Sequence, residues 1–427
     1  MAREPTVVVV GAGIAGICVW DWLRRAGCQT VLLDAGPAAV SSAQLTPGFL
    51  PEEDTWRYGG VDDGDWIRIL AVGGRANVWG RWCGRFSNDV FERWHWPLAS
   101  AEIASAYDQA EAWLNMTSDP VPDRYARFAS EFGSQLTRRT SAHARASSWL
   151  DALSDARSYA RTNTVALRLG TDSTTARKLE VATAAGRETL VASHFVLAAS
   201  PFETVRILRA SGAGHPGIGC GLTDHVIAGF KLIDPAPRTT GSEAALIRTG
   251  SYTIEILGPI EIDHATAELL CANDVPVAPG MSEHAILGLG EQTPRPQQRM
   301  AVHCEELDRL GRPRPRFEAA CTEDDQRMVA DMRRDCLKLI QGLKRDGMTI
   351  VELPSSVEMP RVFHPSGGAI MGRGRDCPVD CSGRLREWNN VWIADASVFP
   401  SSGDCHPTLT IVAFAQRVAA HILGESI

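Results

Sequence analysis

The segment from Thr6 to Gly36 constrains the fold of this 427-residue chain more than any other stretch. Four consecutive valines, Val7 to Val10, predict a short strand buried on both faces, because β-branched residues pack well on a pleated surface. Gly11, Gly13 and Gly16 follow with the G-x-G-x-x-G spacing. This spacing allows a tight turn, a close approach of the backbone to a pyrophosphate, and close packing of a helix on the strand.

A helix and a second strand complete a β-α-β unit after this turn. The helix is predicted to end at Gly27 and to have one apolar face, made of Ile14, Ile17, Cys18 and Trp22. The second strand, Thr30 to Leu33, ends at Asp34, where a carboxylate accepts hydrogen bonds from the ribose hydroxyls of a dinucleotide and repels a 2′-phosphate. The unit therefore predicts binding of NAD or FAD rather than NADP, and a purely structural glycine turn is the weaker alternative.

Composition and charge narrow the class of protein further. Apolar residues make up 44% of the chain and the net charge is −8, which favours a globular protein and argues against a nucleic-acid partner. The 11 cysteines include no C-x-x-C pair, which favours reduced thiols and a cytoplasmic location over a disulfide framework. No apolar run reaches the roughly eighteen residues of a membrane span, and the glycine turn interrupts the N-terminal run, unlike a signal peptide.

The middle of the chain adds a candidate ligand loop and several regular elements. The loop from Val72 to Arg81, VGGRANVWGR, has the small residues that let a backbone pass close to a flat ligand, although an ordinary glycine turn with a packing Trp fits equally well. A helix is expected from Ser100 to Leu114, with Ser100 as its candidate cap. Short strands within Thr162 to Ala199 predict a small antiparallel insert that returns to a buried strand at Phe195, followed by a nucleotide-facing helix from Ser200 to Arg209.

The sequence from Ile233 to Val351 predicts a second layer. It contains mixed strands, a Pro/Arg-rich connection and one long helix, roughly Asp324 to Leu343. We therefore expect an α/β fold, α+β overall, in which a Rossmann-like nucleotide-binding domain assembled from discontinuous segments is joined to a smaller substrate domain with a mixed or antiparallel sheet and helices. The expected nucleotide-binding domain comprises residues 1–98, 162–232 and 360–427, and the substrate or cap domain residues 99–161 and 233–359.

Two histidines near the end of the chain carry the candidate chemistry. His364 precedes a glycine-rich loop, and His406 lies just before a helix that begins after Pro407 and runs from Thr408 to Leu423. The free N–H groups at such a helix start stabilise an anion on a reduced flavin ring. Two imidazoles at the edge of that ring suit alcohol oxidation, because one takes the hydroxyl proton while the other orients the oxygen.

Two plainer interpretations apply to these histidines. Either one alone is more often a residue that caps a turn or bonds a backbone carbonyl group. A zinc site is the other alternative, with Cys377, Cys381, Cys405 and His406 as ligands on paper. The C-x-x-x-C spacing departs from the common C-x-x-C form, and adjacent Cys405 and His406 rarely both reach one tetrahedral ion, so we expect no metal centre.

The chain resembles the glucose-methanol-choline (GMC) oxidoreductases, a family of FAD-dependent alcohol oxidases and dehydrogenases. The matching motifs are GAGIAG, VGGRANVWGR, VLAASPFETVRIL, LTDH at Leu222 to His225, HPSGGAIMG, and NVWIADASVFPSSGDCHPTLTIVAFAQRVAAHI. The resemblance implies that FAD is the dinucleotide and that His364 is the catalytic base, with His406 at the family's second catalytic position. The cofactor-binding residues that it implies are Gly11, Gly13, Ala15, Gly16 and Asp34 for the ADP half, Val165 and Ala199 beside the adenine, Gly73, Gly74, Asn77 and Val78 along the flavin, and Asp395, Ala396, His406, Pro407 and Thr408 on the pyrophosphate and pyrimidine side.

The resemblance also implies a reaction, the oxidation of a primary or secondary alcohol to a carbonyl by hydride transfer to flavin N5. VGGRANVWGR and LGEQTPRPQQR look more like the branch that includes the pyranose oxidases, so the expected substrate is a sugar, glycoside, aminoglycoside or cyclitol. Val78 stands where pyranose oxidases carry the histidine that links the flavin covalently, which predicts a non-covalent, dissociable FAD. The expected partners are this small-molecule alcohol and an electron acceptor, dioxygen or another. A redox-neutral lyase like the hydroxynitrile lyases, a non-catalytic FAD-binding protein and an NAD-dependent dehydrogenase are the alternatives.

Overall fold

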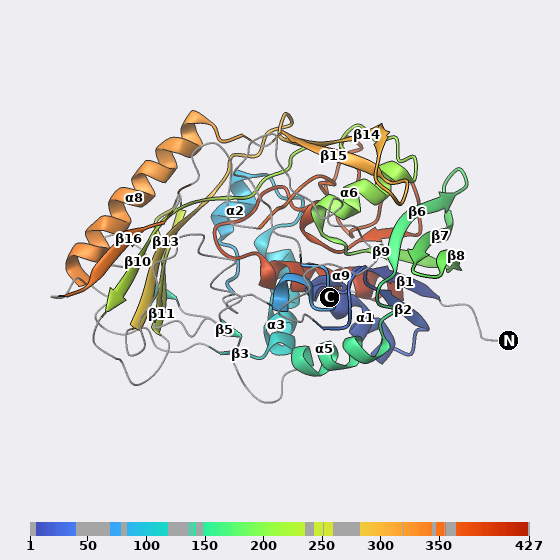
Figure 1. Ribbon diagram of the computed structural model, residues 1–427, viewed down its shortest axis with the longest axis horizontal. Helices are drawn as coiled ribbons and strands as arrows, with labels where there is room; N and C mark the ends of the chain where they lie inside the picture. The colour runs from blue at the N-terminus through green and yellow to red at the C-terminus, as the bar shows by residue number, and fades with distance from the viewer. Residues whose placement is uncertain are drawn as a thin grey trace.

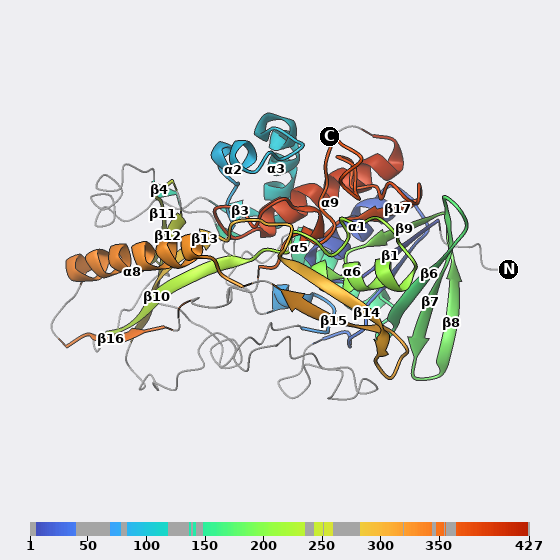
Figure 2. The same cartoon turned by 90° about the horizontal axis from the view of Figure 1, so that it is seen from above.

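Two β-sheets with separate hydrophobic cores organise the molecule (Figure 1). The computed structural model describes residues 6–39, 69–77, 83–117, 136–137, 140–141, 148–234, 243–250, 252–258, 282–318, 320–343, 347–353, 355 and 364–425. A parallel sheet lies toward the N-terminal side, and an antiparallel sheet with the long helix α8 lies at the opposite end of the long axis (Figures 1 and 2).

The parallel sheet has four strands in the order β17-β9-β1-β2. Their bounds are Val391–Ile393 for β17, His194–Leu197 for β9, Val7–Val10 for β1 and Thr30–Leu33 for β2. All four valines of β1 are buried because this strand is central, with Val7 opposite Thr30 on one side and His194 on the other. The predicted β-α-β unit is confirmed, and strands from distant parts of the chain complete its sheet.

Four helices cover this sheet and share its core. Helices α1 (Ile14–Arg25) and α9 (Thr408–Leu423) pack against each other, α3 (Ser100–Leu114) packs on α9, and α5 (Ser148–Tyr159) packs on α1 and α3. As a result α1 is buried on several sides, including at Val19 and Trp20, whereas Trp22 is only partly buried. The single apolar face predicted for this helix is therefore too narrow, because the helix contacts two other helices as well as the sheet.

A three-stranded antiparallel sheet, β6-β7-β8, stands beside the parallel sheet, as the sequence predicts. Its strands are Val165–Thr171, Ala176–Thr183 and Gly186–Val191, and the chain then returns to β9, which begins at His194 rather than at Phe195. Helix α6 (Ser200–Ala210) follows with Pro201 in its first turn. The hairpin of β14 (Arg299–Leu307) and β15 (Pro313–Glu318) packs on α6.

The antiparallel sheet has six strands in the order β16-β10-β13-β12-β11-β4. Their bounds are Thr349–Glu352, His225–Asp234, Ser282–Glu291, Tyr252–Gly258, Glu243–Arg248 and Leu136–Thr137. Helix α8 (Glu323–Leu343) covers one face, where Ile254 and Ile256 of β12 join the second core (Figure 2). Because successive side chains of a strand point to opposite faces, Thr253 and Glu255 of β12 lie on the face that α8 does not cover.

Short elements complete the described structure: the 3-10 turns η2 (Gly74–Asn77) and η3 (Ala396–Val398), helix α2 (Asn88–Arg93), and strands β3 (Met116–Thr117) and β5 (Thr140–Ser141). Helix α3 has its predicted bounds, but the predicted cap is wrong, because Ala99 is the N-cap residue and Ser100 is the first helical residue. The Glu102 side chain accepts the backbone N–H of Ala99 at 2.7 Å. Within the described ranges, no helix combines the length and the apolar character needed to cross a membrane.

The boundary between the two expected domains stays a prediction. Helices α3 and α5 fall within residues 99–161, which the sequence assigned to the substrate domain. Their side chains, including Tyr107 and Trp149, belong to the core of the parallel sheet. A division by hydrophobic cores would therefore place both helices with the nucleotide-binding unit.

Candidate active site

The glycine turn between β1 and α1 has the shape that a bound pyrophosphate requires. Gly11 has a φ of +96°, and a Cβ there would lie 2.4 Å from the carbonyl oxygen of Ala198. A Cβ on Gly16 would lie 1.8 Å from the carbonyl oxygen of Gly11. A Cβ on Gly13, in contrast, would meet no atom within 4 Å, so this glycine borders open space at the N-terminus of α1. Two glycines thus serve the close packing of the turn, and the third leaves room for a phosphate to approach the backbone.

Asp34 lies at the end of β2, next to this turn. Its Oδ2 accepts the backbone N–H of Ala12 at 2.9 Å, and its Oδ1 accepts that of Gly36 at 2.8 Å. Strand β6 starts beside it at Val165, since the N–H of Thr164 donates to the carbonyl oxygen of Asp34 at 2.9 Å. The carboxylate therefore shapes the glycine turn itself. Because each carboxylate oxygen has two lone pairs, its role toward a ribose stays a prediction.

A second glycine-rich loop lies against the first. Gly73 donates its N–H to the carbonyl oxygen of Ala12 at 2.7 Å, and a Cβ on Gly74 would lie 3.4 Å from the Cα of Gly13. Asn77 closes this loop through side-chain hydrogen bonds to two of its carbonyl oxygens, at 3.1 and 2.9 Å. The structure thus brings together the two glycine-rich stretches for which the sequence predicts cofactor contacts. Val78, the next predicted contact, lies outside the described residues.

The remaining predicted cofactor residues lie around the same turn and at the start of α9. Ala199 adjoins Gly11, whose added Cβ would lie 2.8 Å from the Cα of Ala199. The Asp395 side chain is buried and turned inward, with Oδ1 accepting from Ser397 at 2.9 Å and Oδ2 from the Thr204 hydroxyl at 2.6 Å. Because an inward-turned acid cannot bind a pyrophosphate, only the backbone at Asp395 and Ala396 remains for that role. Pro407 is the N-cap of α9 and offers no side-chain cap, so the first-turn N–H groups from Thr408 onward are left for a ligand.

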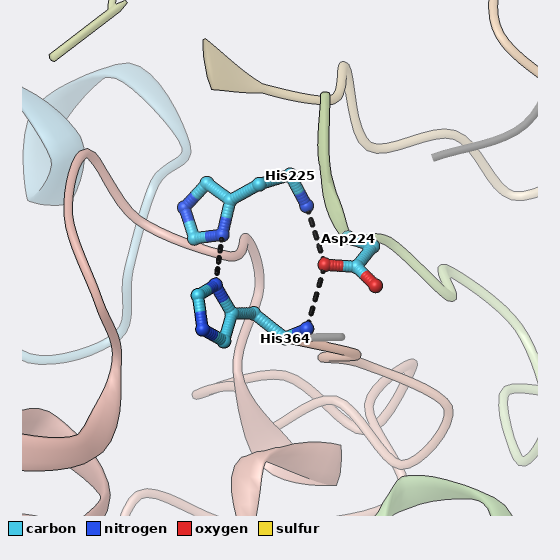
Figure 3. A group of neighbouring side chains, drawn as sticks. All are labelled: Asp224, His225 and His364. Carbon is cyan, nitrogen blue, oxygen red and sulfur yellow. Dashed lines mark hydrogen bonds between the residues drawn. The ribbon is translucent and has the colours of Figure 1, made fainter. Parts of the chain in front are cut away.

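Three histidines from three separate segments form one hydrogen-bonded row. His364 Nδ1 lies 3.1 Å from His225 Nδ1 (Figure 3). On its other side, His364 Nε2 lies 3.2 Å from His406 Nδ1. The structure therefore brings the two predicted catalytic histidines into contact. It adds His225, the first residue of β10, which belongs to the LTDH motif but was not predicted as a site residue.

Glu255 ends this row and was also missed by sequence reasoning. It is 1% exposed on the uncovered face of β12, and its Oε2 lies 2.9 Å from His406 Nε2. Thr253, on the same face, donates its hydroxyl to the carbonyl oxygen of Asp404. The antiparallel sheet thereby holds the segment that leads into α9. The alternation Thr-Ile-Glu-Ile over residues 253–256 is the signal in the sequence, because it puts Glu255 on the strand face opposite to the two isoleucines of the second core.

Burial and charge set different protonation states along the row. Burial lowers the pKa of His364 well below its usual range, and the charges of His406, His225 and Arg75 lower it further. Burial also lowers the pKa of His225 to about 3. For His406 burial acts in the same direction, but the Glu255 carboxylate outweighs it, and the net pKa is raised. His406 is therefore the ring of the three that most readily holds a second proton.

Asp224 fixes the spacing between two of these histidines through the backbone. Its Oδ1 accepts the N–H of His225 at 2.7 Å and the N–H of His364 at 2.8 Å (Figure 3). Beside them Thr223 and Ser366 exchange two backbone hydrogen bonds, at 2.9 and 2.8 Å. One carboxylate oxygen and one short bridge thus join the start of β10 to the His364 segment.

Three of these residues also offer atoms that could bind a metal ion. Asp224, His225 and His364 bring three ligating atoms within 4.8 Å of one another. Those atoms are used by the hydrogen bonds just described, which account for the cluster without a cation. The zinc ligands considered from the sequence, Cys377, Cys381, Cys405 and His406, all lie in the described part of the chain, and the structure does not gather them into a ligand set.

The sequence of the chain is similar to known proteins of one family. Residues 296–415 match the family model described as GMC oxidoreductase. An uncharacterized GMC-type oxidoreductase of Mycobacterium tuberculosis is 26% identical over 98% of this chain and 76% of that protein. The predicted resemblance to the GMC oxidoreductases is confirmed by these matches.

Two further proteins to which the chain is similar have named activities. The C-glycoside 3-oxidase of Arthrobacter globiformis is 28% identical over 55% of this chain and 47% of that protein. The crystal structure of pyridoxine 4-oxidase from Mesorbium loti superposes with a TM-score of 0.70 and 19% identity, covering 99% of this chain and 100% of that one. The likeness to the solved structure confirms the predicted fold class. The match to the GMC oxidoreductase family model and the GMC-type relative confirm the predicted enzyme class, an FAD-dependent alcohol oxidoreductase.

Proposed function

We propose that this GMC oxidoreductase oxidises a primary or secondary alcohol to a carbonyl on a sugar-like molecule: a sugar, glycoside, aminoglycoside or cyclitol. The observation that carries the proposal is the pair of nitrogen atoms, His364 Nε2 and His406 Nδ1, which lie 3.2 Å apart just before α9. Bound FAD supplies the hydride acceptor for such a reaction. The relative named C-glycoside 3-oxidase supports the glycoside part of the substrate class.

In this proposal His364 is the base. Its lowered pKa keeps the ring neutral at physiological pH, so Nε2 has a lone pair for the hydroxyl proton of an alcohol held at the two nitrogen atoms. The O–H bond breaks as the N–H bond on Nε2 forms, and the positive charge then rests on the His364 ring. The Glu255 carboxylate at the far end of the row offsets the positive charge of the two rings nearest to it.

His406 is the proposed orienting donor. Its Nε2 faces Glu255, so its Nδ1–H points toward His364 and toward an alcohol oxygen placed between them. An ionised carboxylate accepts hydrogen bonds and donates none, so a hydrogen bond between these groups requires a proton on His406 Nε2 as well. A charged donor strengthens its hydrogen bond to an oxygen that gains negative charge as its proton leaves.

The proposal is tested by the visible spectrum of the purified holoenzyme under anaerobic conditions. A panel of monosaccharides, glycosides, aminoglycosides, cyclitols, pyridoxine and simple alcohols is added in turn, and bleaching of the flavin absorption is followed. We expect bleaching by members of one sugar-like class and a loss of bleaching rate of about 10²-fold or more in His364→Ala. His215→Ala is the matched control, since His215 is a partly buried histidine outside the row whose Nε2 lies 3.0 Å from the carbonyl oxygen of Arg375.

The same experiment separates the alternatives. A yellow protein that no alcohol bleaches would favour a redox-neutral lyase or a non-catalytic flavin protein. Bleaching by pyridoxine or simple alcohols alone would overturn the sugar-like substrate class while leaving the reaction type intact. A colourless protein that reduces NAD with an alcohol would instead support the dehydrogenase alternative.

We also propose that the FAD is dissociable, because Val78 offers no nucleophile for a covalent link. Acid precipitation of the holoenzyme should release the yellow colour into the supernatant. Colour that remains with the precipitated protein would contradict this proposal.

A further inference from the structure

The hydrogen bonds of His225 determine which of its ring nitrogens carries a proton. His225 is fully buried, and its Nε2 lies 2.7 Å from the backbone carbonyl oxygen of Gly403. A carbonyl oxygen only accepts hydrogen bonds, so Nε2 of His225 is the donor. Gly403 is itself fixed, because it has a φ of +83° and a Cβ there would lie 2.1 Å from the Phe86 ring. The acceptor for His225 is therefore held in place by packing.

The proton on His225 Nε2 determines which nitrogen of His364 carries a proton. A buried, uncharged imidazole with a proton on Nε2 has a lone pair on Nδ1. His225 Nδ1 faces His364 Nδ1 at 3.1 Å, so His364 must donate from Nδ1 (Figure 3). A neutral His364 then has its lone pair on Nε2, the atom that lies 3.2 Å from His406. From His406 to Gly403 the hydrogen bonds consequently all point in one direction, and each ring donates to the next group. The bond to Glu255 points the other way, because His406 donates it from Nε2.

We propose that His225 is a positioning residue that holds His364 in the tautomer with the proton on Nδ1, so that the basic lone pair on Nε2 faces the substrate. This inference rests on the proposed role of His364 as base. His225 touches no substrate in it and acts only through His364. When His364 takes the hydroxyl proton on Nε2, it keeps its Nδ1–H bond to His225.

The surroundings of His225 support an orienting role rather than a charged one. The groups that face it are the His364 ring, the Gly403 carbonyl and, across the strand pair, Glu291 of β13. Glu291 is engaged elsewhere, by Ser401 at 2.8 Å and by Trp94 at 3.0 Å. The backbone N–H of His225 bonds Asp224 and would survive replacement of the ring. Substitution of the side chain thus removes the acceptor for His364 and leaves the local backbone anchors.

The direct test is nitrogen-15 NMR of the holoenzyme with labelled histidine. The His364 resonances are identified by their loss in His364→Ala. We expect a protonated Nδ1 and an unprotonated Nε2 in the wild-type enzyme, and a mixture of tautomers in His225→Leu. A His364 ring with its proton on Nε2 in the wild type would overturn the proposal. Because this readout needs no turnover, it stands even if the proposed reaction is wrong.

Kinetics provide the second readout. We expect His225→Leu to lower kcat by about 10²-fold while KM changes by less than about threefold. In His225→Asn the amide oxygen can accept the Nδ1–H of His364, so kcat should recover to within about tenfold of wild type. His194→Leu is the matched control, because His194 is a partly buried ring in β9 that accepts from Trp392 outside the row.

The two variants also separate positioning from a merely structural role. Equal losses of kcat in His225→Leu and His225→Asn, accompanied by equal losses of FAD content or thermal stability, would show that the ring only fills space. Full activity in His225→Leu would overturn the proposal outright. If His364→Ala retains wild-type activity, the proposed base is wrong. The NMR result then tests only whether His225 sets the tautomer of His364.

Discussion

His406 Nε2 lies 2.9 Å from Glu255 Oε2. His406 lies in the segment before α9, and Glu255 lies in strand β12 of the antiparallel sheet. The contact is buried, with Glu255 1% exposed. It supplies the charge that raises the pKa of His406 against the effect of burial. The row of histidines is therefore completed by a residue from outside the core of the parallel sheet.

Replacement of Glu255 by Gln should move the basic limb of the pH profile of kcat/KM to lower pH. The carboxylate keeps His406 protonated to a higher pH, so its removal lowers the pKa of His406 and the charged donor is lost sooner as pH rises. We expect kcat/KM at neutral pH to fall about 10-fold to 10²-fold. Glu291→Gln is the control, since Glu291 is 2% exposed and bonds Trp94 and Ser401 rather than His406. An unchanged basic limb in Glu255→Gln would contradict the assignment.

The buried His225 should make the protein less stable in acid. Its pKa is about 3 in the folded state against an ordinary 6.5, so the unfolded chain binds a proton first and stability is lost as pH falls from 6.5 toward 3. Between pH 6.5 and 5 this loss amounts to about 2 kcal/mol. Urea unfolding at pH 7 and pH 5 should show a smaller loss in His225→Asn than in the wild type. Equal losses in both proteins would mean that His225 is already protonated in the folded state at pH 5.

Two glycine substitutions should separate packing from cofactor binding. Gly16→Ala places a Cβ 1.8 Å from a carbonyl oxygen, so we expect a large loss of thermal stability even without FAD. Gly13→Ala meets no atom within 4 Å, so the apoprotein should keep its stability while its affinity for FAD falls about tenfold or more. Differential scanning of the apoproteins and titration with FAD measure the two effects. Unchanged FAD affinity in Gly13→Ala would show that the phosphate does not approach this turn.

The buried ion pairs between α6 and the β14-β15 hairpin should be important for stability. Asp308 Oδ2 lies 2.6 Å from a terminal nitrogen of Arg206 and 2.8 Å from Nε of Arg312, and all three side chains are at most 3% exposed. Asp308→Asn leaves two buried guanidinium groups with less compensation and should cost about 3–5 kcal/mol of unfolding free energy. Asp172→Asn, which breaks an exposed pair with Arg177, should cost nothing measurable. Similar losses in both variants would argue against a special role for the buried network.

Local patterns were sufficient to predict most of the parallel-sheet unit. The valine run, the glycine spacing and Asp34 lie within one short segment, and the structure forms β1, α1 and β2 at the expected residues. The bounds of α3 and α9 also follow from helical periodicity, and α8 begins one residue before the predicted start. His364 and His406 were predicted to lie at one edge of a flavin ring, and the structure brings their ring nitrogens within 3.2 Å of each other.

The partners of these histidines could not be predicted in the same way. Glu255 reaches His406 across 151 positions, and His225 reaches His364 across 139. Such contacts depend on how two sheets dock, which no local period specifies. The same limit explains Asp395, where the sequence indicated a polar residue at a strand end but not that its carboxylate turns toward Thr204. Ser100 failed as a cap for a more local reason, because the helix begins one residue earlier than its side chain suggested.

The hydroxyl of Thr253 and the carboxylate of Glu255 both reach the segment that leads into α9, from a strand whose other face is packed against α8. The hydrogen bond between Glu255 and His406 therefore depends on the alignment of two separately packed layers. A substitution beneath α8 that shifts β12 by a fraction of an ångström would leave the glycines of the turn between β1 and α1 in place. It would still break the hydrogen bond between Glu255 and His406. Turnover in such a variant would decline while its flavin stayed bound, so loss of rate alone can report a displacement that begins far from the chemistry.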